Sequence, residues 1–236
     1  MPDADIFARS SIPWVAIRSS AIISIAGLVL CLLASPPVRA QNLVTDGDFE
    51  TTQLGQGNYE YVNGLLNGWL YSGLAVLINV ADNSPWVTPS QTGYSGNQVA
   101  GVQNMGSISQ TFAAPGTGGF DVTWLDSGRT NYDAQNYTVS VLNNATGAIV
   151  SSETLTVTPG ANFSPEALAA SLVAGDSYSL TFQGLDSSGG DATAFIDDVD
   201  VSSGPAPAIG VLPLPMFIPF LAGFAWLHRR RTRGAA

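Results

Sequence analysis

The sequence predicts an all-β domain, specifically a jelly-roll β-sandwich, flanked by a signal peptide and a C-terminal transmembrane helix. Apolar and polar residues alternate in several short runs, which is the period of half-buried strands. The clearest runs are Phe120–Trp124, Tyr137–Val141, Tyr178–Phe182 and Phe195–Val201. Turn-forming sequences such as Asn143–Gly147 and Asp186–Gly190 separate these runs. No helical periodicity recurs between Gln41 and Ser203, and many short strands joined by Gly- and Asn-rich turns are typical of sandwiches and jelly rolls.

Residues 1–40 have the pattern of a secretory signal peptide. Two arginines, Arg9 and Arg18, precede an apolar run from Ala21 to Leu33. Small or short residues follow at Val38–Ala40, as signal peptidase requires, so we expect the mature chain to begin at Gln41. The pattern therefore predicts export from the cytoplasm.

The rest of the chain divides into three parts. Residues 41–203 have the length of one typical domain and are long enough to bury a full core. Residues 204–210 include Gly204, Pro205 and Pro207, which indicates a linker. Residues 211–236 form a membrane-directed tail.

The charge of the domain excludes several partners. Between Gln41 and Ser203 there are sixteen acidic residues and one basic residue, Arg129, which gives a formal charge of −15. Nucleic acid and phosphate ligands need clustered Lys and Arg, so they are excluded as partners. Such a charge keeps an exported protein soluble and favours cation binding, while neutral glycans remain compatible with it.

The composition also argues against catalysis. The chain contains no lysine, its one histidine is His228 and its one cysteine is Cys31, so the domain has none of these residues. That removes Ser-His-Asp, Cys-His and His–metal chemistry. A two-carboxylate glycosidase could still be built from Asp and Glu, but the four glutamates of the domain form no recognisable motif. We therefore expect a protein that is not an enzyme.

The C-terminus contains three elements in a defined order. A short proline motif, Leu212-Pro213-Leu214-Pro215, lies in an apolar segment that runs from Val211 to Leu227. A basic cluster with Arg229, Arg230 and Arg231 follows directly. Apolar residues followed by terminal arginines form a stop-transfer pattern, because the apolar run enters lipid and the arginines stay on the cytoplasmic side.

This order of elements resembles the PEP-CTERM sorting signal of exported proteins from Gram-negative bacteria that make extracellular polysaccharide. The resemblance implies membrane insertion through the C-terminal helix and processing by an exosortase-like transpeptidase. It also implies a location in the cell-envelope membrane, and at the cell surface or in the extracellular matrix after processing. The chain has Pro213-Leu214-Pro215 where the usual motif is Pro-Glu-Pro. A plain C-terminal anchor is the alternative interpretation.

Segments at both ends of the domain carry a second resemblance. Asn42–Glu50, Gly68-Trp69 and Ala194–Val199 resemble the opening strand, an early Gly-Trp and the closing strand of galactose-binding-like and carbohydrate-binding-module-like jelly rolls. This resemblance implies the same fold and leaves the ligand open, because many such domains share a fold and differ in function.

A carboxylate on the closing strand predicts a metal site. Asp197 shares its expected strand face with Val199, so it should point toward the core, where an unpaired charge is costly. Ca²⁺ binds carboxylate and carbonyl oxygens. The resemblance implies that Glu50 and Asp197 share a structural Ca²⁺, with Asp48 as a third ligand. The alternative is that Asp197 bonds to backbone amides or to Arg129.

Aromatic residues are candidates for a sugar-stacking surface. The candidates are Trp69, Tyr71, Trp86, Tyr94, Trp124 and Tyr132. Trp69 and Trp124 fall at strand positions that are typical of a core. Trp86 and Tyr94 lie in a loop rich in Pro, Gly and Asn, so we predict these two as ligand-binding residues.

Two functions follow from these observations. The first is a non-catalytic cell-surface or extracellular-matrix protein that is sorted through its PEP-CTERM-like tail. The alternative is a carbohydrate-binding module that recognises extracellular polysaccharide. An aromatic surface on the folded domain would favour the alternative.

Overall fold

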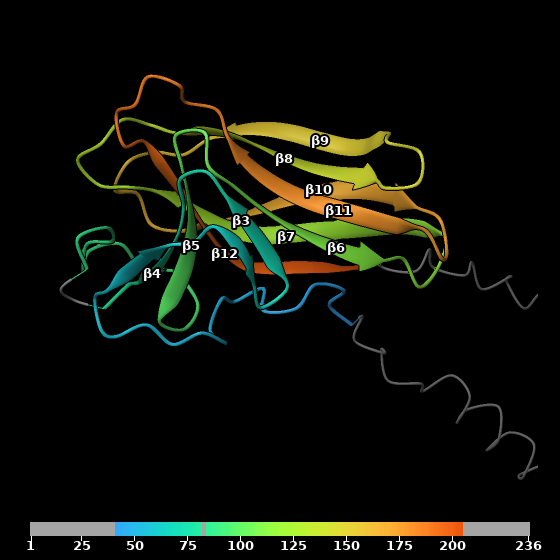
Figure 1. The fold of residues 1–236 in the computed structure, drawn as a ribbon, viewed down its shortest axis with the longest axis horizontal. Helices are drawn as coiled ribbons and strands as arrows, with labels where there is room; N and C mark the ends of the chain where they lie inside the picture. Colours follow the sequence, from blue (N-terminus) through green and yellow to red (C-terminus); the bar gives the residue numbers. More distant parts are fainter. Residues whose placement is uncertain (1–40, 82–83, 205–236) are drawn as a thin grey trace, which may run out of the picture. The chain divides into compact units, whose positions relative to one another are not determined.

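The computed structural model describes residues 41–81 and 84–204, which form two antiparallel β-sheets of six strands each (Figure 1). The prediction of an all-β sandwich is therefore confirmed. The predicted signal peptide, nearly all of the linker and the sorting tail lie outside the described residues. Within the described ranges, no helix is long and apolar enough to cross a membrane.

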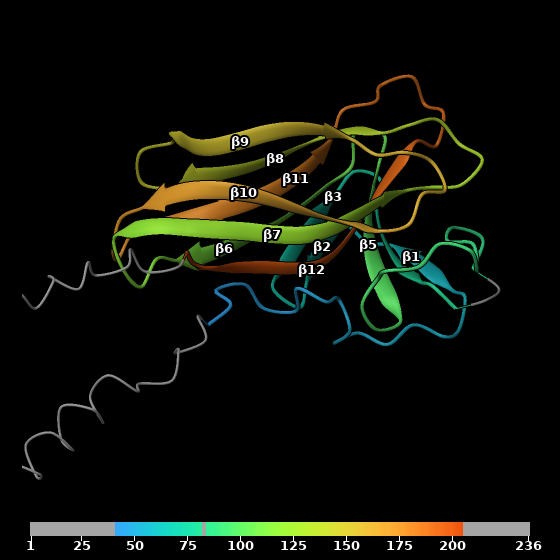
Figure 2. The ribbon, with the colours of Figure 1, turned by 180° about the vertical axis from the view of Figure 1, so that it is seen from behind.

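Each sheet is built from strands that are far apart in the chain. Sheet A has the order β1 (Tyr59–Tyr61), β4 (Ala75–Asn79), β5 (Gln98–Gln103), β12 (Thr193–Ser203), β7 (Gly118–Gly128) and β10 (Ser164–Leu172). Sheet B has the order β2 (Gly64–Leu66), β3 (Trp69–Ser72), β6 (Ser107–Ala113), β11 (Ser177–Gly184), β8 (Asn136–Asn143) and β9 (Ile149–Thr156). Figure 2 shows β7, β10 and β12 of sheet A in front of sheet B. The chain thus crosses between the sheets repeatedly, as in jelly-roll sandwiches.

The main core lies between the sheets and follows the predicted alternation. Strands β8 and β11 bury every second residue, and the expected core residues Trp69 and Trp124 are both buried. The ring of Phe182 lies 6.4 Å from that of Trp69 and 5.5 Å from that of Trp124, measured between centroids. Side chains from both sheets therefore meet in one aromatic centre.

A second, smaller cluster covers the outer side of sheet A. It contains Val76, Ile78 and Phe195 from the sheet, together with Trp86 from the loop between β4 and β5. Strands β4 and β5 are buried at every position. Their continuous apolar sequence is thus explained by packing on both faces.

The segment predicted as an opening strand is irregular. Asp46 and Phe49 have positive φ angles of 50° and 56°, which interrupt an extended backbone. The segment still lies along β12, because the Leu43 amide donates to the Val201 carbonyl at 2.8 Å. A side chain at Gly47 would collide with the carbonyl of Val199, so this contact needs glycine.

Buried glutamines fasten the irregular segment to the sandwich. Gln98 accepts a hydrogen bond from the Leu54 amide at 2.7 Å and donates to the Phe49 carbonyl at 2.8 Å. Gln110 accepts from the Thr45 amide at 2.6 Å and donates to the Thr45 carbonyl at 2.9 Å. The domain contains no cysteine, so no disulfide can hold its first residues. The side-chain amides of Gln98 and Gln110 hold them instead, and in each amide both the oxygen and the nitrogen make hydrogen bonds.

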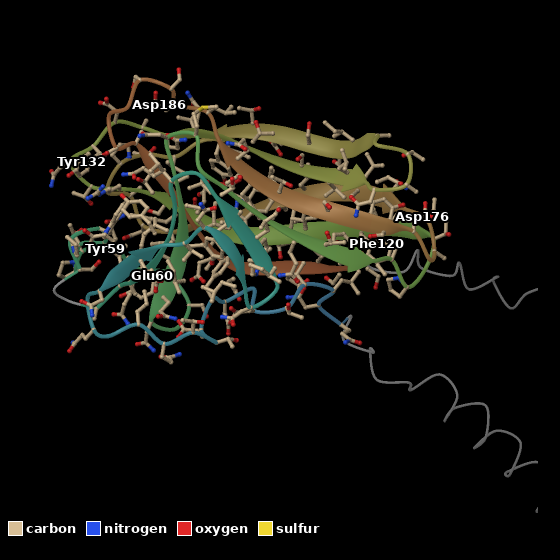
Figure 3. All side chains as sticks on the ribbon, in the orientation of Figure 1. Tyr59, Glu60, Phe120, Tyr132, Asp176 and Asp186 are labelled. Atoms are coloured by element: carbon tan, nitrogen blue, oxygen red, sulfur yellow. The ribbon has the colours of Figure 1, made fainter. Side chains whose placement is uncertain are left out.

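The two ends of the sandwich differ. The Asn42 side chain bonds to the backbone of Val199 and Val201, and the Gly204 amide donates to the Gly119 carbonyl at 3.1 Å. Because Ser203 pairs with Phe120, Asn42 and Gly204 lie toward the end of the sandwich that contains Phe120, which Figure 3 labels and which is here called the proximal end. The opposite, distal end carries the loops that follow β5, β7 and β11, with Tyr132 among them.

Candidate functional site

The two predicted ligand residues lie in different surroundings. Trp86 is 3% exposed, and the rings of Tyr59 and Tyr61 pack edge-on against it at 5.3 and 6.0 Å. Tyr94 is half-buried, and its ring lies 5.6 Å from that of Phe163. The loop that contains both residues folds back on sheet A, so Trp86 forms part of a packed cluster and does not present an open ring.

Arg129 lies between two aromatic rings. Its guanidinium carbon is 3.7 Å from the centroid of the Trp86 ring and 4.0 Å from that of Tyr132. A cation over the face of an aromatic ring is attracted by the ring quadrupole. Tyr59, Tyr61, Trp86, Arg129 and Tyr132 together are called the arginine–aromatic cluster. It lies at the distal end, where Figure 3 shows Tyr59 and Tyr132 on the same side of the molecule.

The cluster presents aromatic surface to solvent. Tyr59 is 47% exposed, Tyr61 is 46% exposed and Tyr132 is 38% exposed. The hydroxyl of Tyr61 donates to Oε1 of Gln103 at 2.7 Å. Partial burial, and next the charge of Asp191, raise the pKa of Tyr61. Tyr61 therefore remains neutral at physiological pH, and the three tyrosines offer ring surface to a ligand.

An acidic residue balances the charge of Arg129. Oδ2 of Asp191 lies 3.9 Å from Nη1 of Arg129, and the side chain of Asp191 is 53% exposed while that of Arg129 is 10% exposed. Asp191 adopts a φ of 56° in the loop that precedes β12. The pair places one acidic and one basic group at the edge of the aromatic surface.

Polar atoms without partners gather at the distal end. Five buried side-chain atoms make no hydrogen bond within the described parts of the chain: Trp86 Nε1, Gln103 Nε2, Asn104 Oδ1, Arg129 Nε and Gln135 Oε1. Some of the residues that carry them are neighbours: Gln135 donates to the Asn104 carbonyl at 2.7 Å, and the Arg129 amide donates to the carbonyl of Thr193, which pairs with Gln103. Buried polar atoms are nearly always satisfied, so each of these five atoms has a hydrogen bond left for water or a ligand group.

Glu50 and Asp197 hold the two ends of one loop segment. Oε1 of Glu50 accepts hydrogen bonds from the amides of Asn97 and Gln98 at 2.5 and 2.7 Å. Oδ2 of Asp197 accepts from the Ser95 amide at 2.6 Å. Both carboxylates therefore bond to backbone amides of the same short segment before β5.

Asp197 is completely buried. Burial raises its pKa to about 7, and the charges of Asp198 and Glu50 act in the same direction, while the amides of Ser95 and Asp198 oppose the shift. A β-bulge between Asp197 and Asp200 changes the alternation of β12. As a result Val199 faces the main core, and Asp197 faces the loop before β5 instead of sharing its side.

The backbone-amide alternative for Asp197 is therefore observed, and Arg129 pairs with Asp191 instead. Asp48 is exposed, and its Oδ1 lies 3.5 Å from the Glu50 amide. Among the residues with described positions, no three His, Cys, Asp or Glu side chains are arranged to hold a metal ion. Any cation at Glu50 and Asp197 would need backbone carbonyls for its remaining ligands.

Comparison with known proteins gives similarity at the level of structure. No family model matches the chain, and no curated protein matches it. A carbohydrate-binding module solved with β-1,4-galactotriose matches with a TM-score of 0.48 and 16% identity over 70% of this chain and 100% of that one. A xylan-binding domain from Paenibacillus barcinonensis matches with a TM-score of 0.44 and 12% identity, covering 66% of this chain and 100% of that chain.

A family 35 carbohydrate-binding module from Clostridium thermocellum matches with a TM-score of 0.42 and 17% identity, covering 62% of this chain and 99% of that chain. At these identities and TM-scores the similarities assign neither a family nor a ligand. The description of the chain as a two-sheet sandwich rests on its own strand pairing.

Sequence reasoning did not single out the cluster as a unit. It selected Trp86, but it missed Tyr59, Tyr61 and Asp191. One available signal was the uniqueness of Arg129, because a sole base among sixteen acids needs a specific partner. A second was the alternation Tyr59-Glu60-Tyr61, which places two tyrosines on one face of a short strand.

Proposed function

We propose that the domain is a non-catalytic carbohydrate-binding module that binds sugar at the arginine–aromatic cluster. The observation that carries the proposal is the coincidence of three half-exposed tyrosines with unpaired buried donors and acceptors at one end of the sandwich. Sugar rings have apolar faces that pack on aromatic rings, and their hydroxyls both donate and accept hydrogen bonds. Ligand sites in proteins combine such apolar surface with a few placed polar groups.

The outer face of sheet B is a poorer candidate for sugar binding. Its outward residues on β6, β8 and β11 are mostly hydroxyl and amide side chains, for example Ser109, Ser140 and Thr181, which lie side by side across the strands. The described strands of sheet B place no aromatic side chain on this face. A sugar would therefore lack a stacking partner there, which favours the distal end.

The carboxylates of the domain support a binding role over catalysis. Glu50 and Asp197 are occupied by backbone amides, and Asp126 accepts hydrogen bonds from Tyr137 and Ser164. At the cluster, Asp191 pairs with the only base of the domain. This arrangement supplies polar contacts at the cluster. Among the described residues Asp126 and Glu166 line one common cavity, and Asp126 is already bonded there to Tyr137 and Ser164.

Removing the exposed rings should weaken sugar binding. We expect Tyr61→Ala and Tyr132→Ala each to reduce affinity about tenfold, or about 1.4 kcal/mol, because each change removes stacking surface. A glycan array identifies a ligand for residues 41–204, and calorimetry then compares the variants. Leu65→Ala is the control, since Leu65 is 75% exposed on sheet B, away from the cluster. Equal loss in the control variant, or no loss in either tyrosine variant, would contradict the assignment.

We also propose that the protein is exported and processed at its C-terminus. The order of Leu212–Pro215, the apolar run and Arg229–Arg231 supports a sorting signal that an exosortase-like transpeptidase cuts near Pro215. The predicted outcome is a mature chain in the envelope that lacks residues after about Pro215. Intact-mass measurement checks this, and a mature chain that still carries Arg229–Arg231 would leave only the plain membrane anchor.

A structural Ca²⁺ at Glu50 and Asp197 is a further part of the proposal. Both amide hydrogen bonds of Glu50 fall on Oε1, which leaves Oε2 for a cation. Asp197 is fully buried and has no basic partner among the described residues. A bound Ca²⁺ would neutralise these charges and tie the start of the domain to its last strand.

Stability should depend on pH through Asp197 when Ca²⁺ is chelated. Its pKa is raised to about 7 in the folded state from 3.8, so the folded protein holds the proton over this interval. The free energy of unfolding should therefore fall as pH rises from 4 to 7, by at most about 1.4 kcal/mol per pH unit. Urea unfolding across this range measures the slope. Added Ca²⁺ should raise the melting temperature and flatten the slope, because it binds the ionised carboxylate.

Two variants make this test specific. Asp197→Asn should reduce the slope in chelator to the part that other buried carboxyls such as Asp126 contribute, while Asp200→Asn, on the same strand, should leave the slope unchanged. Stability that rises with pH over this interval would refute the buried-carboxyl explanation. A melting temperature that does not change when Ca²⁺ is added would refute the proposed Ca²⁺ site.

A further inference from the structure

We infer that the arginine–aromatic cluster selects uncharged sugars and rejects uronates, and that Asp191 sets this selectivity. The inference rests on the sugar-binding role proposed above. It concerns the charge of the ligand, which the three exposed tyrosines alone leave open. The contacts of Arg129 and Asp191 decide it.

Arg129 is fixed as a hydrogen-bond donor toward the cluster. The residue is 8% exposed, its guanidinium lies between the rings of Trp86 and Tyr132, and its Nε has no partner in the described part of the chain. A guanidinium carries five N–H donors in a rigid plane. A buried donor set of this kind needs an acceptor, and no described side chain satisfies Nε.

An arginine alone would suit a carboxylate, but its surroundings are acidic. Asp191 lies 3.9 Å from Nη1 and already offsets the charge. Asp133 is close by, because its Oδ2 lies 3.2 Å from the point where a side chain at Gly190 would begin. The domain contains no other base, and its formal charge, these residues included, is −15. A uronate carboxylate would therefore approach Arg129 past the charge of Asp191, in a domain whose overall charge is strongly negative.

An uncharged sugar meets no such penalty. Two neighbouring hydroxyls can accept from Arg129 and donate to Asp191 at the same time, because each hydroxyl has both a donor and acceptors. The half-exposed rings of Tyr61 and Tyr132 supply the apolar contact. The Arg129–Asp191 pair thus recognises two neighbouring hydroxyls, and the charge of Asp191 disfavours an anionic sugar.

The test uses matched ligands that differ only in charge. The probes are neutral oligosaccharides of glucose, galactose and mannose, each paired with the same oligosaccharide oxidised from hydroxymethyl to carboxylate at C6. Binding is measured on the full-length chain in a non-ionic detergent without a sugar head group. We expect the best neutral probe to bind at least about tenfold more tightly than its oxidised counterpart at physiological salt.

Asp191→Asn tests the selecting residue. Asn tolerates the positive φ of this position and the side chain is half-exposed, so the fold should be retained, which the melting temperature checks. The variant should reduce the ratio of the affinity for the neutral probe to the affinity for the oxidised probe at least about fivefold. Asp121→Asn is the matched control, because it changes the net charge equally on β7 near the proximal end and should leave the ratio unchanged.

The outcomes separate the two proposals. Equal or tighter binding of the oxidised probe by the native chain overturns the inference and leaves sugar binding standing. The role of Asp191 is overturned if the ratio of neutral to oxidised affinity is the same in Asp191→Asn as in the native chain. It is also overturned if Asp121→Asn changes this ratio as much as Asp191→Asn does. Binding of no probe by either chain overturns the sugar-binding proposal, and the inference with it.

Discussion

Replacing Trp86 by alanine is expected to destabilise the domain by about 3–5 kcal/mol, the usual cost of removing a large buried aromatic side chain. Trp86 is buried in the cluster on the outer side of sheet A, beneath Tyr59 and Tyr61. Its loss would also remove one of the two rings that hold the charge of Arg129. Urea unfolding of residues 41–204 measures the change as a shift of the midpoint at constant slope.

Two further variants separate packing from binding. Trp86→Phe should cost clearly less than alanine, because it keeps an aromatic face and removes the unpaired Nε1. Tyr132→Ala should change stability by no more than about 1 kcal/mol, since its ring is half-exposed and most such surface changes are small. If Trp86→Ala weakened sugar binding while stability stayed within about 1 kcal/mol, Trp86 would be a ligand contact and its structural role would be refuted.

The second large effect is expected from Tyr137→Phe, at about 2–4 kcal/mol. The Tyr137 hydroxyl accepts from Trp124 Nε1 at 2.8 Å and donates to Oδ2 of Asp126 at 2.7 Å. Removing it leaves a buried donor and a buried carboxylate without this partner, and each unsatisfied group costs about 1–3 kcal/mol. Denaturant unfolding of the variant and the native domain gives the difference.

The same variant should change the pH dependence. Burial raises the pKa of Asp126, and the hydrogen bond from Tyr137 opposes that shift. Losing the bond raises the folded-state pKa further above the unfolded value, so stability should fall with rising pH over a wider interval. Tyr71→Phe is the matched control, because Tyr71 is equally buried and its hydroxyl makes no hydrogen bond within the described residues. Similar losses in both variants would show that the network contributes nothing.

The strands and the main core followed from the sequence because their signal is local. Alternation in runs such as Tyr137–Val141 and Tyr178–Phe182 depends only on neighbouring residues, and both runs bury the side that it predicts. Trp69 and Trp124 were correctly predicted as core for the same reason. The irregular path of the opening segment was not predictable in this way, because it depends on positive φ angles at Asp46 and Phe49.

The candidate site could be predicted only in part. Loop composition suggested an exposed Trp86, but the loop packs on sheet A because Val76, Ile78 and Phe195 would otherwise expose a continuous apolar face. The pairing of Arg129 with Trp86 joins separate loops, so no local pattern encodes it. The bulge on β12 likewise places Asp197 and Val199 on different sides of the sheet. A bulge does not change the alternation of apolar and polar residues in the sequence, so the pattern could not predict it.

Gly204 and the arginine–aromatic cluster lie at opposite ends of the sandwich, and this placement determines how the domain bears mechanical load. A pull between Gly204 and a ligand held near Arg129 acts on the end of β12 in one direction and on the end of β7 in the other. These two strands are antiparallel neighbours, paired from Ala194–Gly128 to Ser203–Phe120. The force therefore shears their hydrogen bonds together instead of opening them one at a time. A ligand bound as proposed above would thus load these two strands in shear when it is pulled away from Gly204.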